Sequence, residues 1–125
     1  MADFDVVAAS LRADAGDVRA LAEALAVRLE GALPMNTRVD RRPKRLLSRE
    51  KVVRRVEVDL GEARYSLALD DRGAVDAVRA HEVRGIVLKN EPLPLDAWLD
   101  AMARDLTALA QASEEGRRAL ERLLI

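Results

Sequence analysis

Residues 52–69 read VVRRVEVDLGEARYSLAL, and their alternation of apolar and polar residues predicts two β-strands. The apolar face of the first strand comprises Val52, Val56, Val58 and Leu60, whereas Val53 falls on the polar face and Arg54 interrupts the pattern. The second strand returns with Tyr65, Leu67 and Leu69 on its apolar face. Gly61-Glu62 between them predicts a two-residue type II′ hairpin turn, because glycine adopts the positive φ that this turn needs.

Further strands are predicted on both sides of this hairpin. Residues 35–41 follow Pro34, which cannot continue a helix, and predict a short strand. The turn sequence at 70–73 is followed by a third strand of the hairpin series at 74–81 and a fourth at about 84–88. The sequence therefore predicts an antiparallel meander within 36–89, with one face exposed to water.

Apolar stripes at helical period predict helices on both sides of the sheet, over 4–33 and 95–125. Gly16 divides the first stripe, so one kinked helix and two helices, the second capped by Asp17, both fit. This stripe also forms an alanine-lined seam, which offers an alternative use as a dimer interface. In the second stretch Asp96 is a candidate N-cap, and a further helix starts at Ser113.

These elements together predict a single α+β domain over 1–125. It has an N-terminal helix or helices, a four- to five-strand antiparallel meander, and two C-terminal helices packed on one sheet face. A chain of 125 residues can bury a self-supporting core, because roughly two-thirds of the unfolded surface is removed from water at this size.

Charge is segregated along the chain. The window 38–55 contains nine basic and two acidic residues, a net charge of +7, whereas the rest of the chain, with 12 basic and 20 acidic residues, carries −8. The overall charge of −1 hides this asymmetry. A cationic segment on an acidic body predicts an anionic partner rather than a particular fold.

The centre of the cationic window is predicted to be a long, mobile loop at 41–51, because it contains Pro43 and has no clean period. Its candidate partner-binding residues are Arg41, Arg42, Lys44, Arg45, Arg49 and Lys51. Charges within about a Debye length of one another, roughly 8 Å, create a common positive potential. Three partners fit this potential: an acidic protein surface, the phosphates of a nucleic acid, and an anionic membrane surface.

An acidic protein surface meets the fewest objections. The window has no aromatic residue on which a base could stack, and the acidic remainder would repel a polyanion. Only Leu46 and Leu47 are available for insertion into a membrane. We therefore expect a non-enzymatic interaction or adaptor module that self-associates or belongs to a larger protein assembly. Binding of nucleic acid through the same loop is the alternative.

Residues suited to catalysis or cofactor binding are scarce. The chain has no cysteine and one histidine, His81, so disulfides, thiolate metal sites and cysteine nucleophiles are excluded. The serines lie in no Gly-x-Ser-x-Gly motif, and the glycines form no phosphate-binding loop. Turns and helix caps account for the carboxylates. We expect no enzymatic activity, cofactor, metal site or small-molecule substrate, and His81 to be a polar residue at a strand end.

The N-terminal residues MADFD are acidic where a signal peptide would be basic, and no apolar run approaches the roughly 18 residues of a membrane span. We therefore expect a cytoplasmic protein. With its acidic Ala/Leu start and the sequence LPLDAWL at 93–99, the chain resembles small cytoplasmic proteins of the high-GC actinobacteria. This resemblance implies no activity and no functional residues.

Overall fold

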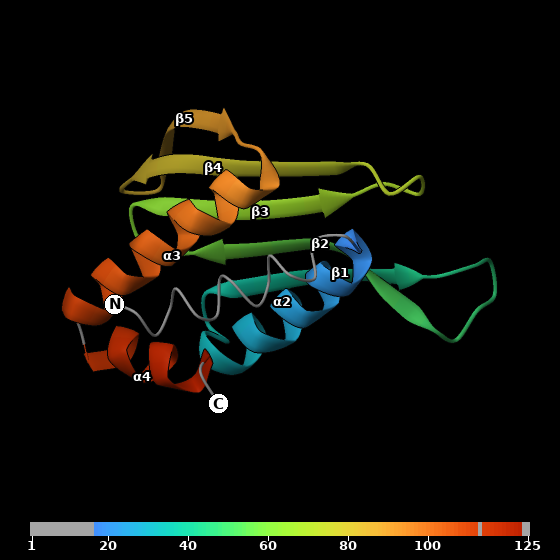
Figure 1. Ribbon diagram of the computed structural model, residues 1–125, viewed down its shortest axis with the longest axis horizontal. Coiled ribbons are helices and arrows are strands. Elements are labelled where there is room, and N and C mark those ends of the chain that lie inside the picture. The colour runs from blue at the N-terminus through green and yellow to red at the C-terminus, as the bar shows by residue number, and fades with distance from the viewer. Residues whose placement is uncertain (1–16, 113, 124–125) are drawn as a thin grey trace.

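The computed structural model describes residues 17–112 and 114–123 (Figure 1). Its elements are α2 (Val18–Ala32), β1 (Thr37–Pro43), β2 (Lys51–Asp59), β3 (Ala63–Leu69), β4 (Val75–Val83), β5 (Ile86–Pro92), α3 (Leu95–Ala112) and α4 (Glu114–Leu123). The predicted α+β class is confirmed, with helices before and after a five-strand sheet. No helix in this described part has the length and hydrophobicity needed to cross a membrane.

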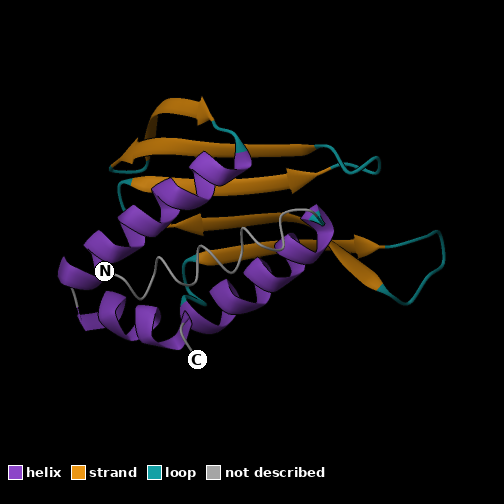
Figure 2. Ribbon diagram, in the orientation of Figure 1, coloured by secondary structure: helices purple, strands orange, loops and turns teal. Residues whose placement is uncertain are grey.

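The sheet is an antiparallel meander with strand order β1-β2-β3-β4-β5. The turn after β2 follows the sequence prediction, because Gly61 has a φ of +98° and the Leu60 N–H donates to the Ala63 carbonyl at 2.8 Å. Helices α2 and α3 cover one face of this sheet, and no described helix covers the other (Figure 2). The predicted meander with one open face is therefore confirmed.

The core lies between the two covering helices and the sheet. Helix α2 packs on β1 and β2, and α3 packs on β3 and β4. Trp98 of α3 is buried against Tyr65 of β3, with ring centroids 5.8 Å apart in an edge-to-face arrangement. The Trp98 indole N–H also donates to the Val78 carbonyl at 3.1 Å, so this ring fixes α3 to two neighbouring strands.

The helix ends agree with the sequence in one case and differ in the other. Asp17 caps α2, accepting hydrogen bonds from the Arg19 and Ala20 amides at 3.1 and 3.2 Å. The stripe from 4 to 16 and its proposed seam lie outside the described residues. Asp96 is not the N-cap of α3, because the helix already begins at Leu95 and the Trp98 N–H donates to the Pro94 carbonyl.

The C-terminal region differs from the prediction of two helices packed on one sheet face. Only α3 makes substantial contact with the sheet, whereas α4 packs chiefly against α2 and α3 (Figure 1). The physical reason is that α2 and α3 together already occupy the covered face. Residues 114–123 therefore lie at the edge of the helical layer.

A β-bulge in β2 overturns the predicted faces of its first residues. Asp40 pairs with Arg55, but the next residue, Arg41, pairs with Val53, which leaves Arg54 as the extra residue. One inserted residue exchanges the two faces of the strand beyond it. Val53 is consequently buried at 5% exposure and Val52 is not, the reverse of the simple alternation.

Candidate functional site

The basic residues lie on a hairpin arm, which we define as residues 41–51. Strand β1 continues to Pro43 and β2 begins at Lys51, so the connecting loop is 44–50 and shorter than predicted. Figure 1 shows this arm extending past the rest of the sheet. Pro43 is tolerated because β1 is an edge strand.

The loop of the arm is built from hydrogen-bonded turns. The Lys44 N–H donates to the Glu50 carbonyl at 2.9 Å and closes the base of the loop. Within it, the Ser48 N–H donates to the Arg45 carbonyl at 2.9 Å, and the Glu50 N–H donates to the Ser48 Oγ at 3.1 Å. Leu47 has a φ of +67° at the turn. The loop is therefore shorter than predicted and consists of turns closed by these bonds.

Arg41 points back to the body of the protein and is held there. Its Nη1 donates to Glu30 Oε2 of α2 at 3.0 Å, and its Nη2 donates to the other carboxylate oxygen. This two-pronged ion pair ties the base of the arm to α2. Of the six predicted contact residues, Arg41 is therefore a positioning residue of the arm.

The Arg41–Glu30 pair predicts a pH-dependent tether. Hydrogen bonds from Arg41 hold the pKa of Glu30 below its ordinary value of 4.5. The resulting stabilisation is present above pH 4.5 and is lost as the pH falls through the lowered pKa in the folded state. Arg41→Gln should raise the Glu30 pKa, as measured by NMR titration of its carboxyl carbon, whereas Arg28→Gln should leave it unchanged. An unaltered Glu30 pKa in Arg41→Gln would contradict the tether.

Two further cations of the arm form exposed ion pairs. The Arg42 Nε lies 3.3 Å from Asp40 Oδ2, and the Lys44 Nζ lies 4.0 Å from Glu50 Oε2. Pairs of this kind contribute little to stability in water, typically about 0–1 kcal/mol. Both cations thus keep most of their capacity to attract an anionic partner.

The tip of the arm combines free cations with exposed leucines. Arg45 and Arg49 at the tip, and Lys51 on the stem at the start of β2, are exposed and form no ion pair with another residue of 17–112 or 114–123. Leu46 and Leu47 between them are 94% and 95% exposed. The charge pattern of the sequence pointed to the cations but gave the leucines no part in protein contact.

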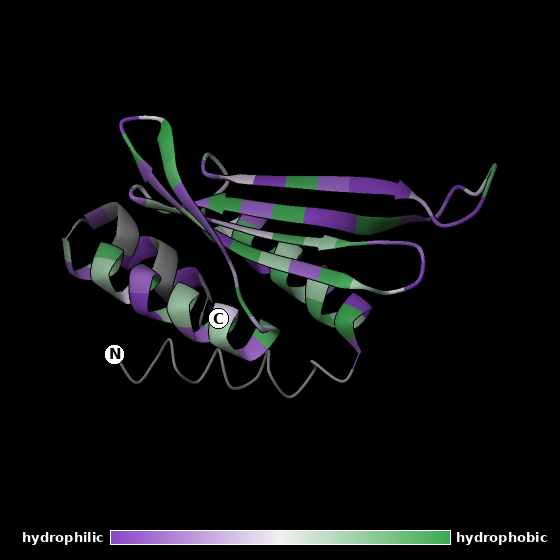
Figure 3. Ribbon diagram, turned by 90° about the horizontal axis from the view of Figure 1, so that it is seen from above, coloured by the Kyte–Doolittle hydropathy of each residue, from purple (hydrophilic) through white to green (hydrophobic). Residues whose placement is uncertain are grey.

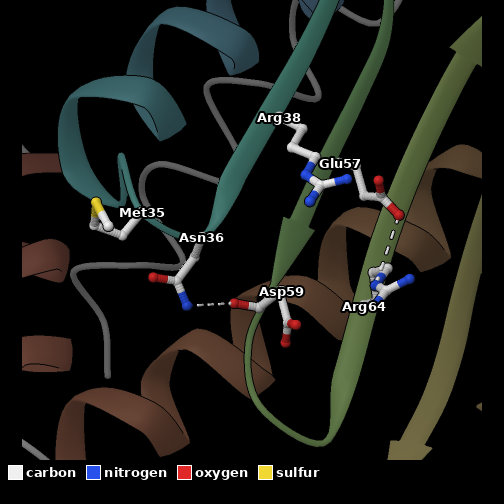
Figure 4. Close-up of a pocket in the computed structure, with 6 residues that line it drawn as sticks. All are labelled: Met35, Asn36, Arg38, Glu57, Asp59 and Arg64. Atoms are coloured by element: carbon white, nitrogen blue, oxygen red, sulfur yellow. Dashed lines mark hydrogen bonds and ion pairs between the residues drawn. The ribbon is translucent and has the colours of Figure 1, made fainter. Parts of the chain in front are cut away.

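A second polar feature lies on the open face of the sheet, at the end distant from the arm. A hollow of about 210 Å³ is lined by Met35, Asn36, Arg38, Glu57, Asp59 and Arg64 (Figure 4). Its two arginines and two acids cancel in formal charge, and Arg64 already lies 3.6 Å from Glu57. The polar-face alternation of β2 and β3 is the sequence signal for Glu57, Asp59 and Arg64, whereas the other three residues join them through the pairing of β1 with β2.

Arg64 also neutralises the buried carboxylate of Glu82. Glu82 is only 6% exposed, and its Oε2 lies 2.8 Å from Arg64 Nη2. That oxygen has no partner with hydrogen-bond geometry among the described residues, although Oε1 accepts from the same nitrogen at 3.1 Å. The neighbouring His81 is half-buried in β4 and lies in no cluster of metal-ligating residues within the described chain.

A third cluster joins β3, β4 and α3. The Tyr65 hydroxyl donates to Asp105, while Arg79 donates to the Tyr65 oxygen at 2.9 Å and to Asp105 at 3.1 Å. Burial, reinforced by Asp105, raises the pKa of Tyr65 well above its ordinary value. The Tyr65 hydroxyl therefore stays neutral while it is hydrogen-bonded to both members of the Arg79–Asp105 ion pair. This cluster suits a structural role, as a clamp that holds α3 against β3 and β4. Asp105 is 40 residues from Tyr65, and no local pattern connects them.

Comparison with protein-family models, curated proteins and solved structures gave no match.

Proposed function

We propose that this chain is a non-enzymatic protein-interaction or adaptor module whose basic arm docks on an acidic surface of a protein partner in a larger assembly. The observation that carries the proposal is the tip of the arm. There, Leu46 and Leu47 are almost fully exposed between Arg45 and Arg49. An extended element with an apolar end and a cationic rim suits insertion into a partner's groove.

The two kinds of side chain have separate roles in this proposal. Complementary charge speeds the encounter and orients the partners, and its effect falls with salt. Burial of the leucines would supply affinity, at about 1.5–3 kcal/mol for each side chain that becomes fully buried. Arg42 and Lys44 would lie along the stem of the arm, and Arg41 would hold the stem in place.

The leucines favour a protein over a nucleic acid as the partner. Phosphates bind cations but make no favourable contact with aliphatic side chains such as those at the tip. Single-stranded bases need aromatic side chains for stacking. In the described chain both Tyr65 and Trp98 are buried in the core. Nucleic-acid binding through the arm therefore stands as the competing outcome of the test.

The test places a photo-crosslinking amino acid at Leu47 in the full-length protein in cells, followed by nuclease treatment and mass spectrometry. We expect a discrete protein adduct with an acidic surface. Changing Arg45, Arg49 and Lys51 to glutamine and Leu46 to serine should lower the partner's affinity about 100-fold. The matched control changes Arg28, Arg72 and Arg84 to glutamine, which alters net charge equally but should cost no more than about threefold.

The competing outcome is measured with labelled single- and double-stranded nucleic acid. Anisotropy titrations at about 50 and 200 mM salt would reveal phosphate contacts as a steep loss of affinity. Micromolar binding that disappears in the arm variant, but persists in the control, would replace the protein partner with a nucleic acid. Failure of both experiments would remove the arm as an interaction site.

A further inference from the structure

The outer edge of β5 is free in the described part of the chain. Strand β5 pairs with β4 and ends the strand order, and Figure 1 places it at the margin of the sheet. Ile86 and Leu88 at its start are 64% and 61% exposed, and Val83 and Val87 beside them are also exposed. Figure 3 shows the apolar start of this strand beside the end of β4, where this hairpin stands away from the other strands. Exposed apolar residues on an unpaired edge mark a surface for pairing with another strand.

The hydrogen-bond pattern shows which main-chain groups this edge offers. The Leu93 N–H donates to the Ala77 carbonyl at 2.9 Å, so Leu93 faces β4. Successive residues of a strand alternate, and Asn90 and Pro92 therefore face outward. Pro92 has no N–H to offer, which leaves Asn90 with an outward donor and an outward acceptor.

The charged side chains of β5 are arranged so that two copies of the strand, paired antiparallel, place opposite charges next to each other. Lys89 and Glu91 flank Asn90, with an apolar segment on each side, Ile86 to Leu88 before and Pro92 to Pro94 after. Consider two such strands paired antiparallel and centred on Asn90. Lys89 of each copy then lies opposite Glu91 of the other copy, so the contact occurs twice. Registers centred on Lys89 or Glu91 would place like charges opposite one another, which is unfavourable.

We propose that this edge is a self-association site, where β5 pairs antiparallel with β5 of a second copy of the chain around Asn90. The two Asn90 residues exchange their main-chain hydrogen bonds. The regular register covers Lys89, Asn90 and Glu91, because Leu88 is the extra residue of a bulge in β5. The apolar residues 86–88 of one copy then lie on the side of Pro92 and Leu93 of the second copy. The pairing is isologous and closes as a two-fold dimer rather than a fibre.

The dimer gives the basic arms a defined arrangement. Strands β1 and β5 are at opposite edges of the sheet, so pairing through β5 leaves both arms exposed. The two-fold axis directs them to opposite corners of one continuous sheet. The self-association does not depend on the arm having a partner, and each can fail without the other.

The test is sedimentation velocity on the full chain from about 1 to about 500 µM, a range that covers weak association. The wild-type mass should rise from one chain to two. Asn90→Pro should remain a monomer with an unchanged circular dichroism spectrum, because the donor that it removes faces away from β4. Asn90→Ala keeps the main-chain groups and should dimerise like the wild type.

Charge reversal tests the register independently of the proline variant. Lys89→Glu and Glu91→Lys should each raise the dissociation constant about tenfold, because each places like charges opposite in two symmetric contacts. The double variant restores opposite charges and should dimerise within about threefold of the wild type. A monomer at every concentration, a dimer indifferent to these changes, or a dimer lost only in the arm variant would each overturn the proposal.

Discussion

Replacing Val53 with aspartate should destabilise the protein by more than about 3 kcal/mol, whereas Val52→Asp should cost less than about 1 kcal/mol. Val53 is buried under α2, and its N–H donates to Glu23 Oε1 at 3.2 Å. A new carboxylate at this position would be desolvated beside the existing one. Val52 is half-buried on the other side of the strand, where an aspartate side chain can reach water.

The two free energies of unfolding are compared by urea denaturation at neutral pH, followed by far-ultraviolet circular dichroism. The pair is a matched control, since the residue type, the substitution and the strand are the same. A larger loss at Val52 than at Val53 would contradict the bulge at Arg54 and restore simple alternation along β2. The result also bears on the base of the arm, because Val53 pairs with Arg41 immediately beyond the bulge.

Trp98→Ala should destabilise the protein by about 3–5 kcal/mol, the usual cost of removing a large aromatic side chain from a core. The change opens a cavity between α3 and the sheet and removes the edge-to-face contact with Tyr65. It also leaves the Val78 carbonyl without the indole donor that now lies 3.1 Å away. Helix α3 should loosen first, which amide hydrogen exchange over 95–112 would detect.

Trp98→Phe separates the contributions to this loss. The phenyl ring preserves most of the packing but cannot donate to Val78, so the cost should be smaller, with about 1–3 kcal/mol attributable to the unpaired carbonyl. Denaturation curves are again followed by circular dichroism, since Trp98 is the only tryptophan. A loss below about 1 kcal/mol for Trp98→Ala would show that α3 is held mainly by other contacts, such as the Tyr65–Arg79–Asp105 cluster.

The basic arm was visible in the sequence because charge is a property of each residue. The window 38–55 and all six candidate cations could be named without a fold. Their individual roles could not, because Arg41 meets Glu30 only when β1 packs on α2. The same limit applies to Arg64 and Glu82, which form an ion pair across two strands.

The sequence by itself determined the α+β class, the antiparallel meander and the turn at Gly61, and it offered the cap at Asp17 as one of two alternatives. Periodicity, turn residues and caps act over a few neighbouring residues, so their effect on structure can be predicted from a short stretch of sequence. The tertiary structure alone decided the bulge at Arg54, the packing of α4 on other helices, and the clamp of Tyr65 by Asp105. Each of these depends on which surfaces meet after distant segments pack. The free energy of that packing comes from residues far apart in the sequence, which no local pattern relates.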